Sequence, residues 1–85
     1  MKVQVTQSHI DKGVQASCYN CPISQSLLEN NKELNEVIVK QGSVEMYWKN
    51  DGYSFYHLPE SAMNFIRDFD AGEKVNPFEF ELNIK

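Results

Sequence analysis

The sequence predicts an α+β fold, in which two helices cover one face of a mainly antiparallel five-stranded sheet in the order β-α-β-β-β-α-β. Three observations predict this two-layer arrangement. Apolar and polar residues alternate over several short segments, which is typical of strands with one buried face. Two other segments repeat apolar residues at helical spacing, and each follows a proline signal. The chain has 85 residues, enough for one hydrophobic core, so we expect residues 1–85 to form a single domain.

The first strand is predicted at the start of the chain, over residues 2–6. Val3 and Val5 alternate there with polar residues, so one face of the strand should be buried. Residues 7–20 are polar and irregular, with Gly13 as an expected turn. We therefore expect a loop between the first strand and the first helix.

The first helix is expected to begin directly after Cys21. Pro22 suits the first helical turn, because an N–H at that position would have no partner within the helix. The helix should end at residues 30–31, where two asparagines favour a C-terminal cap. The apolar stripe expected to face the sheet is formed by Ile23, Leu27 and Leu28.

A three-stranded meander is predicted in the middle of the chain. Residues 36–40 are rich in β-branched side chains, residues 43–48 alternate apolar with polar side chains, and residues 53–58 return after a turn. Asp51 and Gly52 favour this turn, because an Asp-Gly pair accommodates the positive φ angles that hairpin turns require. These three strands should therefore be neighbours.

The second helix and the last strand complete the predicted fold. The helix should begin after Pro59 and end at Gly72. The apolar face of this helix is expected to be formed by Ala62, Phe65, Ile66 and Phe69. Apolar and polar side chains then alternate over residues 78–85, which predicts a strand with Glu79 and Glu81 turned toward water or a partner.

The charge and hydropathy of the sequence argue against two classes of partner. Eight Lys and Arg residues stand against twelve Asp and Glu residues, and this net charge of -4 disfavours binding to nucleic-acid phosphates. No apolar run approaches the roughly 18 residues of a membrane-spanning helix, and residues 1–4 lack the apolar stretch of a signal peptide. We therefore expect a cytoplasmic protein that binds neither nucleic acid nor membrane.

Cys18 and Cys21 form a CxxC pair for which three interpretations remain open. At the expected helix start, unpaired N–H groups and the helix dipole would lower the pKa of the Cys21 thiol, as in thiol-redox proteins. Together with His9 and His57, the pair could instead supply the four ligands of a structural zinc site. In the third interpretation both thiols are inert and the protein needs no cofactor, which is our prediction.

The aromatic residues around the turn at residues 50–52 are the predicted binding surface. These residues are Tyr47, Trp48, Tyr53, Phe55 and Tyr56. We expect Trp48 and Phe55 to pack inside, so that Tyr47 and Tyr53 line the opposite face, with Tyr56 as a further candidate. Exposed tyrosines are favoured anchors of binding surfaces. The alternative is that they are cross-strand pairs that only stabilise the meander.

Two stretches carry a recognisable pattern. The first reads VTQxHI over residues 5–10 and continues with CxxCPI over residues 18–23, and the second reads FIRxFDxGExVxPFxF over residues 65–80. This pattern resembles a family of small uncharacterised proteins of bacteria and their phages. The resemblance implies a phage setting, in which small proteins bind host factors or immune signals. It implies no activity, cofactor or catalytic residue.

Together these observations predict a small non-enzymatic binding protein, and the resemblance implies that it is encoded by a phage and acts in the host cytoplasm. The sequence contains no Ser-His-Asp order, Gly-rich phosphate loop or HExxH motif. The expected partner is a host defence or housekeeping protein that is inhibited, or a small nucleotide-like signal ligand that is sequestered. Arg67, the only arginine, joins the predicted binding residues, and a homo-oligomer could bring it near lysines. The alternative is a zinc or thiol-redox protein that uses the CxxC pair.

Overall fold

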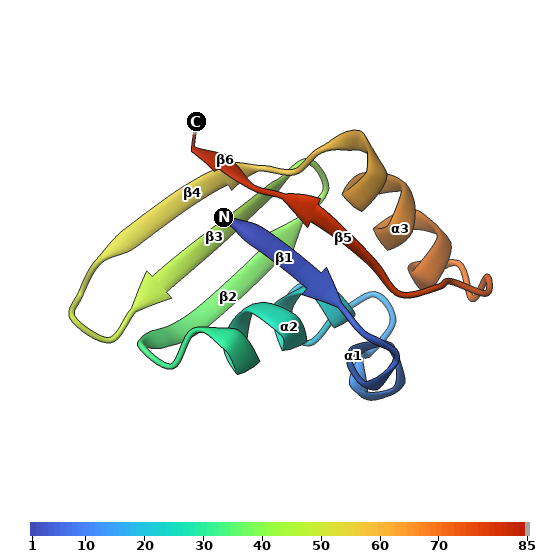
Figure 1. The fold of residues 1–85 in the computed structure, drawn as a ribbon, viewed down its shortest axis with the longest axis horizontal. Helices are drawn as coiled ribbons and strands as arrows, with labels where there is room; N and C mark the ends of the chain where they lie inside the picture. The colour runs from blue at the N-terminus through green and yellow to red at the C-terminus, as the bar shows by residue number, and fades with distance from the viewer. Residues whose placement is uncertain (85) are drawn as a thin grey trace.

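The computed structural model describes residues 1–84, which contain three helices and six strands around one hydrophobic core (Figure 1). In chain order these elements are β1 (Lys2–Val5), α1 (Gln7–Lys12), α2 (Pro22–Asn30), β2 (Leu34–Lys40), β3 (Ser43–Trp48), β4 (Tyr53–His57), α3 (Glu60–Asp70), β5 (Phe78–Glu81) and β6 (Asn83–Ile84). The predicted α+β class is confirmed. The predicted facing of the side chains at residues 83–85 lies outside what the structure describes.

The described strands form two sheets, so the prediction of a single five-stranded sheet is wrong. In the smaller sheet β1 pairs antiparallel with β5, and Val3 stands opposite Phe80. The larger sheet has the order β2-β3-β4-β6, and its neighbouring strands are also antiparallel. The prediction fails because alternation shows which face of a strand is buried but does not show which strand it pairs with.

The predicted last strand is divided between the two sheets at Leu82. The backbone N–H of Leu82 donates a hydrogen bond to the carbonyl of Met1 at 2.8 Å, and its side chain is buried. The residues before it pair with β1, and the residues after it pair with β4. One extended segment, drawn in red in Figure 1, therefore joins the two sheets.

The predicted loop over residues 7–20 contains helix α1, which the hydrophobic pattern does not reveal. The hydroxyl oxygen of Thr6 accepts a hydrogen bond from the backbone N–H of His9 at 3.4 Å, and the His9 ring accepts one from the backbone N–H of Thr6 at 2.9 Å. Glu or Gln usually makes this reciprocal cap. The cap, rather than an apolar stripe, marks the start of α1.

Helix α2 starts after Cys21 and ends before Asn31, as predicted, but the side chains that it buries differ from the predicted stripe. Leu28 is exposed, whereas Ser24 and Ser26 are fully buried. The hydroxyl of Ser26 donates a hydrogen bond to the carbonyl of Gln4 on β1 at 2.5 Å. Because its polar atom has a partner, this serine can be buried, and it ties α2 to β1.

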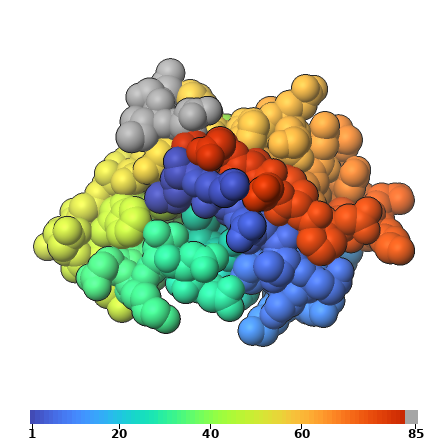
Figure 2. Space-filling view, in the orientation of Figure 1, coloured from blue at the N-terminus to red at the C-terminus, as the bar shows by residue number. Residues whose placement is uncertain are grey.

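The core lies between the two sheets and is closed by the helices. Helix α2 contacts both β1 and β2, and α1 packs on α2. Phe65 of α3 stacks on Phe78 of β5, with ring centroids 4.6 Å apart. Figure 2 shows side chains of β1, β5 and α2 filling the centre of this side of the molecule. The larger sheet is thus covered on one face by strands as well as by helices, which the two-layer prediction did not include.

The other elements follow the prediction. The meander of β2, β3 and β4 is confirmed, and so is helix α3, whose residues Ala62, Phe65 and Phe69 are buried. Gly72 follows the helix with a φ of 81°, a left-handed conformation that glycine adopts without steric cost. Within residues 1–84, no helix combines the length and the hydrophobicity that a membrane span requires.

Candidate functional site

The outer face is the surface of β2, β3 and β4 that points away from the core. Its nine residues stand three to a strand: Glu36, Ile38 and Lys40 on β2, Ser43, Glu45 and Tyr47 on β3, and Tyr53, Phe55 and His57 on β4. None of these nine side chains is buried. The other face of the same strands buries Val37, Val44 and Met46 in the core. The outer face is therefore the accessible side of the sheet.

Aromatic rings occupy the β4 side of the outer face. Tyr47 and Tyr53 are direct cross-strand partners, and their ring centroids lie 5.2 Å apart at an interplanar angle of 55°. These tyrosines are 36% and 54% exposed. Phe55 makes an edge contact with the ring of His57, with centroids 5.6 Å apart. Each ring thus has a neighbour that restricts its motion and still presents apolar surface to a partner.

A charged network lies at the centre of the outer face, around Glu45. One carboxylate oxygen of Glu45 lies 2.9 Å from the Lys40 ammonium, and the other accepts a hydrogen bond from the Tyr47 hydroxyl at 3.1 Å. The hydrogen bond from Lys40 lowers the pKa of Glu45, and the same bond raises the pKa of Lys40. The hydrogen bond that the Tyr47 hydroxyl donates to Glu45 raises the pKa of that hydroxyl. The network therefore holds its charges over a wide pH range.

The structure corrects the predicted facing of two aromatic residues. Tyr56 stands opposite Val44 on the core face and is 9% exposed, so it does not join Tyr47 and Tyr53. Phe55, expected inside, lies on the outer face, because residues two apart on a strand share a face and Tyr53 is there. Trp48 faces the core side as expected. Phe55 is thus the outer-face aromatic residue that the sequence interpretation missed, although alternation from Tyr53 could have placed it.

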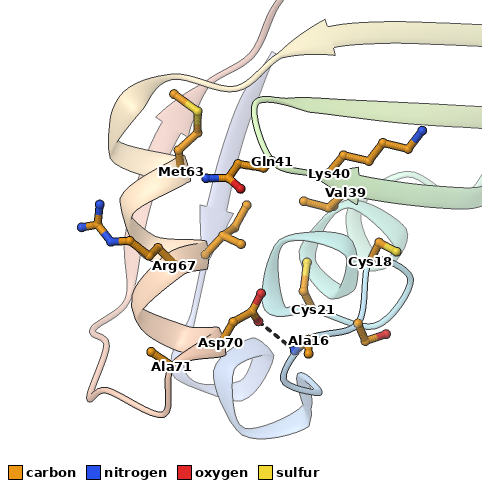
Figure 3. Close-up of a pocket in the computed structure, with 12 residues that line it drawn as sticks. Ala16, Cys18, Cys21, Val39, Lys40, Gln41, Met63, Arg67, Asp70 and Ala71 are labelled. Carbon is orange, nitrogen blue, oxygen red and sulfur yellow. Dashed lines mark hydrogen bonds between the residues drawn. The ribbon is translucent and has the colours of Figure 1, made fainter.

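Arg67 lies on α3, away from the outer face. Its Nε atom is 3.6 Å from a carboxylate oxygen of Asp68, and both side chains are largely exposed. Figure 3 shows the guanidinium directed away from the cavity beside it. The structure therefore does not bring Arg67 together with Tyr47 and Tyr53.

A second feature, the cysteine cavity, lies between α3, the loop before α2 and the end of β2. It has a volume of about 500 Å³. Its walls include Cys18, Cys21, Val39, Gln41, Met63 and Ile66 (Figure 3). Both cysteines are free thiols, and Cys18 is exposed whereas Cys21 is only 4% exposed. Both cysteines of the CxxC pair thus line the same cavity, and only Cys18 is accessible from the surface.

The pKa of the Cys21 thiol is raised, whereas the thiol-redox interpretation expected it to be lowered. Burial raises the pKa of Cys21, since a thiolate is poorly solvated there. Hydrogen bonds from the backbone and side chain of Ser24 act in the opposite direction but do not overcome burial. The expectation that the helix start would lower this pKa is therefore wrong, because burial outweighs the effect of the N-terminal N–H groups.

The four residues of the alternative zinc interpretation are not assembled. Both ring nitrogens of His9 have partners, Thr6 on one side and Glu29 on the other, where Nε2 lies 2.6 Å from a carboxylate oxygen. His57 lies on the outer face of β4. Within residues 1–84, no three His, Cys, Asp or Glu side chains are grouped closely enough to hold a metal ion. Within the described residues, His9 and His57 are therefore not grouped with Cys18 and Cys21 as metal ligands.

Comparison of the chain with protein-family models, with curated proteins and with solved structures gave no match. The resemblance to small bacterial and phage proteins stays a prediction from the two sequence stretches.

Proposed function

We propose that this chain is a small non-enzymatic protein, encoded by a phage, that binds and inhibits a host protein in the host cytoplasm through its outer face. One observation supports this most strongly: Tyr47, Tyr53 and Phe55 lie together on a sheet face without a buried side chain. Tyrosine is enriched at the centres of protein interfaces, because it combines a large apolar ring with a hydroxyl and few rotatable bonds. The phage setting rests on the sequence resemblance alone.

The charged network around Glu45 also supports the proposal that the outer face binds a protein. Burying an unpaired charge in an interface is costly, but Glu45 already has two partners on its own chain, Lys40 and Tyr47. A partner can therefore cover Glu45 without supplying a cation of its own. The rings on either side remain available for apolar contact.

A protein partner has more support than a small nucleotide-like ligand. Phosphate groups favour clustered Arg and Lys side chains. Lys40 is held by Glu45 on the outer face, whereas Arg67 extends away from the cysteine cavity. These two cations do not converge on one position, so we propose a host defence or housekeeping protein as the target.

The test is capture from a bacterial lysate with immobilised wild-type chain, the double variant Tyr47→Ala/Tyr53→Ala and the control Tyr19→Ala. Tyr19 is also an exposed tyrosine, 49% accessible, but it lies in the loop before α2. We expect a protein that is retained by the wild type and by the control and is lost with the double variant.

Purified target should then bind with at least about a tenfold weaker affinity to the double variant, as expected for the loss of two interface anchors. Size-exclusion chromatography with light scattering identifies self-association through the same face. Equal retention by all three proteins would contradict the proposal, and so would dimers that disappear only in the double variant.

A further inference from the structure

The side chains of the outer face form rows that run across β2, β3 and β4. In the row nearest the turn between β3 and β4, Glu36 stands opposite Tyr47, and Tyr47 stands opposite Tyr53 (Figure 1). All three side chains are exposed. Directly opposed residues on one sheet face have Cβ atoms about 5 Å apart. Glu36 is therefore close enough to Tyr47 for its carboxylate and the tyrosine ring to contact the same group of a partner.

Glu36 differs from the other carboxylate of the outer face in having no cation beside it. Glu45 is paired with Lys40, whereas the ion pairs found within residues 1–84 do not include Glu36. The hydrogen bond to Glu45 is the main cause of the raised pKa of Tyr47, and the negative charge of Glu36 adds to it. An uncompensated negative charge thus acts on the ring of Tyr47.

A partner that covers this row has to compensate the charge of Glu36. Taking an unpaired carboxylate out of water is costly, and a cation supplied by the partner removes most of that cost. The net charge of -4 on the whole chain also attracts a basic surface before contact is made. This end of the outer face is therefore complementary to a basic side chain.

The two tyrosine rings favour arginine as that side chain. The ring centroids of Tyr47 and Tyr53 lie 5.2 Å apart, so one group can contact both rings, and the bond from the Tyr47 hydroxyl to Glu45 holds the first ring in place. A guanidinium packs flat on an aromatic ring and donates two parallel hydrogen bonds to a carboxylate. The ammonium of lysine is more strongly hydrated and lacks this planar geometry.

We infer that Glu36, Tyr47 and Tyr53 form a site for an arginine side chain of the partner protein. The guanidinium packs on the tyrosine rings and donates hydrogen bonds to the Glu36 carboxylate. This inference rests on the proposed function, because it names the chemistry of the segment that the outer face binds. It assigns Glu36 a role in binding that is separate from the network around Glu45.

The test is NMR titration of the isotope-labelled chain with the capped peptide acetyl-Gly-Arg-Gly-amide. The comparison peptide carries citrulline in place of arginine, which keeps the shape of the side chain and removes its charge. We expect the arginine peptide to shift the ring signals of Tyr47 and Tyr53 and the side-chain signals of Glu36. It should bind at least about threefold more tightly than the citrulline peptide, as a cation on exposed aromatic rings does.

Three variants separate the contributions to this site. Glu36→Gln should weaken binding of the arginine peptide at least about threefold and leave the citrulline peptide unaffected. Tyr53→Leu keeps an apolar side chain but removes the ring, and should weaken the arginine peptide by a similar factor. Glu73→Gln is the matched control, because it removes the same charge from an exposed position in the loop after α3. It should retain the wild-type affinity.

The inference is overturned if the wild type binds both peptides equally or neither, or if Glu36→Gln binds the arginine peptide as tightly as the wild type. Its failure is distinguishable from failure of the proposed function. A host protein that is lost with Tyr47→Ala/Tyr53→Ala but binds Glu36→Gln with wild-type affinity would overturn the arginine site alone. A lysate without any protein that depends on the two tyrosines would contradict the proposed function, whatever the peptides show.

Discussion

Tyr53 and Tyr56 lie three residues apart on β4 and point to opposite faces of the sheet. Tyr53 contacts Tyr47 on the outer face with its ring tilted against that of Tyr47, whereas Tyr56 stands opposite Val44 in the core. The same residue type is therefore exposed at one position and packed into the core at the other. This difference can be measured without knowing any partner.

Tyr56→Ala is expected to lower the free energy of unfolding by about 3–5 kcal/mol, because it leaves a cavity where a buried ring stood. Tyr53→Ala should cost less than about 1 kcal/mol, since it removes only an exposed cross-strand contact. Urea unfolding followed by circular dichroism measures both values. Equal losses in the two variants would show that the assignment of faces on β4 is wrong.

The ion pair between Lys40 and Glu45 should make stability depend on pH in a defined direction. The lowered pKa of Glu45 means that its contribution is present above the ordinary pKa of glutamate and is lost as the pH falls through the lowered value. The raised pKa of Lys40 means that its contribution is present below the ordinary pKa of lysine and is lost as the pH rises through the raised value.

Thermal unfolding of the wild type and Glu45→Gln from about pH 3 to about pH 11 measures this dependence. We expect the largest difference in melting temperature at intermediate pH and a difference that shrinks toward both ends of this range. Glu36→Gln removes the same charge from the same face and is the control. A difference that stays constant over the whole range would rule out the Lys40–Glu45 bond as its source.

His9 should stabilise the fold by linking the start of α1 to α2. His9→Ala removes the cap on Thr6 and the bond to Glu29, and we expect it to cost about 1–3 kcal/mol of unfolding free energy. The bond to His9 lowers the pKa of Glu29, so that pKa should return toward its ordinary value in the variant. NMR titration of the Glu29 side chain measures this change.

His57→Ala is the control for His9→Ala, since His57 is exposed on the outer face. It should leave both the stability and the Glu29 titration close to those of the wild type. An unchanged Glu29 pKa in His9→Ala would contradict the link between the two helices.

The two thiols should differ in reactivity. Cys18 is exposed, whereas Cys21 is buried and its pKa is raised, so little thiolate is available there at neutral pH. Reaction of the native chain with Ellman's reagent should therefore show one fast thiol and one that reacts only as the chain opens. Cys18→Ser should abolish the fast phase. A fast phase of two thiols would be inconsistent with the buried position of Cys21.

The local patterns in the sequence predicted most of the helices and strands. They could not predict which distant strands pair with each other. Alternating side chains located β1, β3 and the C-terminal strand segment, because burial of one face leaves a period of two, and the turn at Asp51 and Gly52 located β4. The same period continues through Leu82, where the chain changes from one sheet to the other. That change depends on a hydrogen bond to Met1, more than eighty residues away along the chain, which no local pattern contains.

The residues of the candidate site were also predicted only in part. Tyr47 and Tyr53 were predicted on an exposed face because alternation along the strands prevents all the aromatic rings near the turn from facing the helices. The cluster around Glu45 was missed because Lys40 and Glu45 meet only when β2 and β3 pair in the observed register. His9 was taken as a metal-ligand candidate, and its capping role depends on a helix that lacks an apolar stripe.

The pairing of β1 with β5 also constrains how the chain can fold during its synthesis. β1 precedes the meander along the chain, but its partner strand begins only at Phe78, after the meander and α3. The meander can form from neighbouring segments, whereas Val3 and Val5 must wait until β5 has been translated. Until β5 pairs with β1, the apolar side of the meander lacks the cover that Val3, Val5 and Phe80 give it in the folded core.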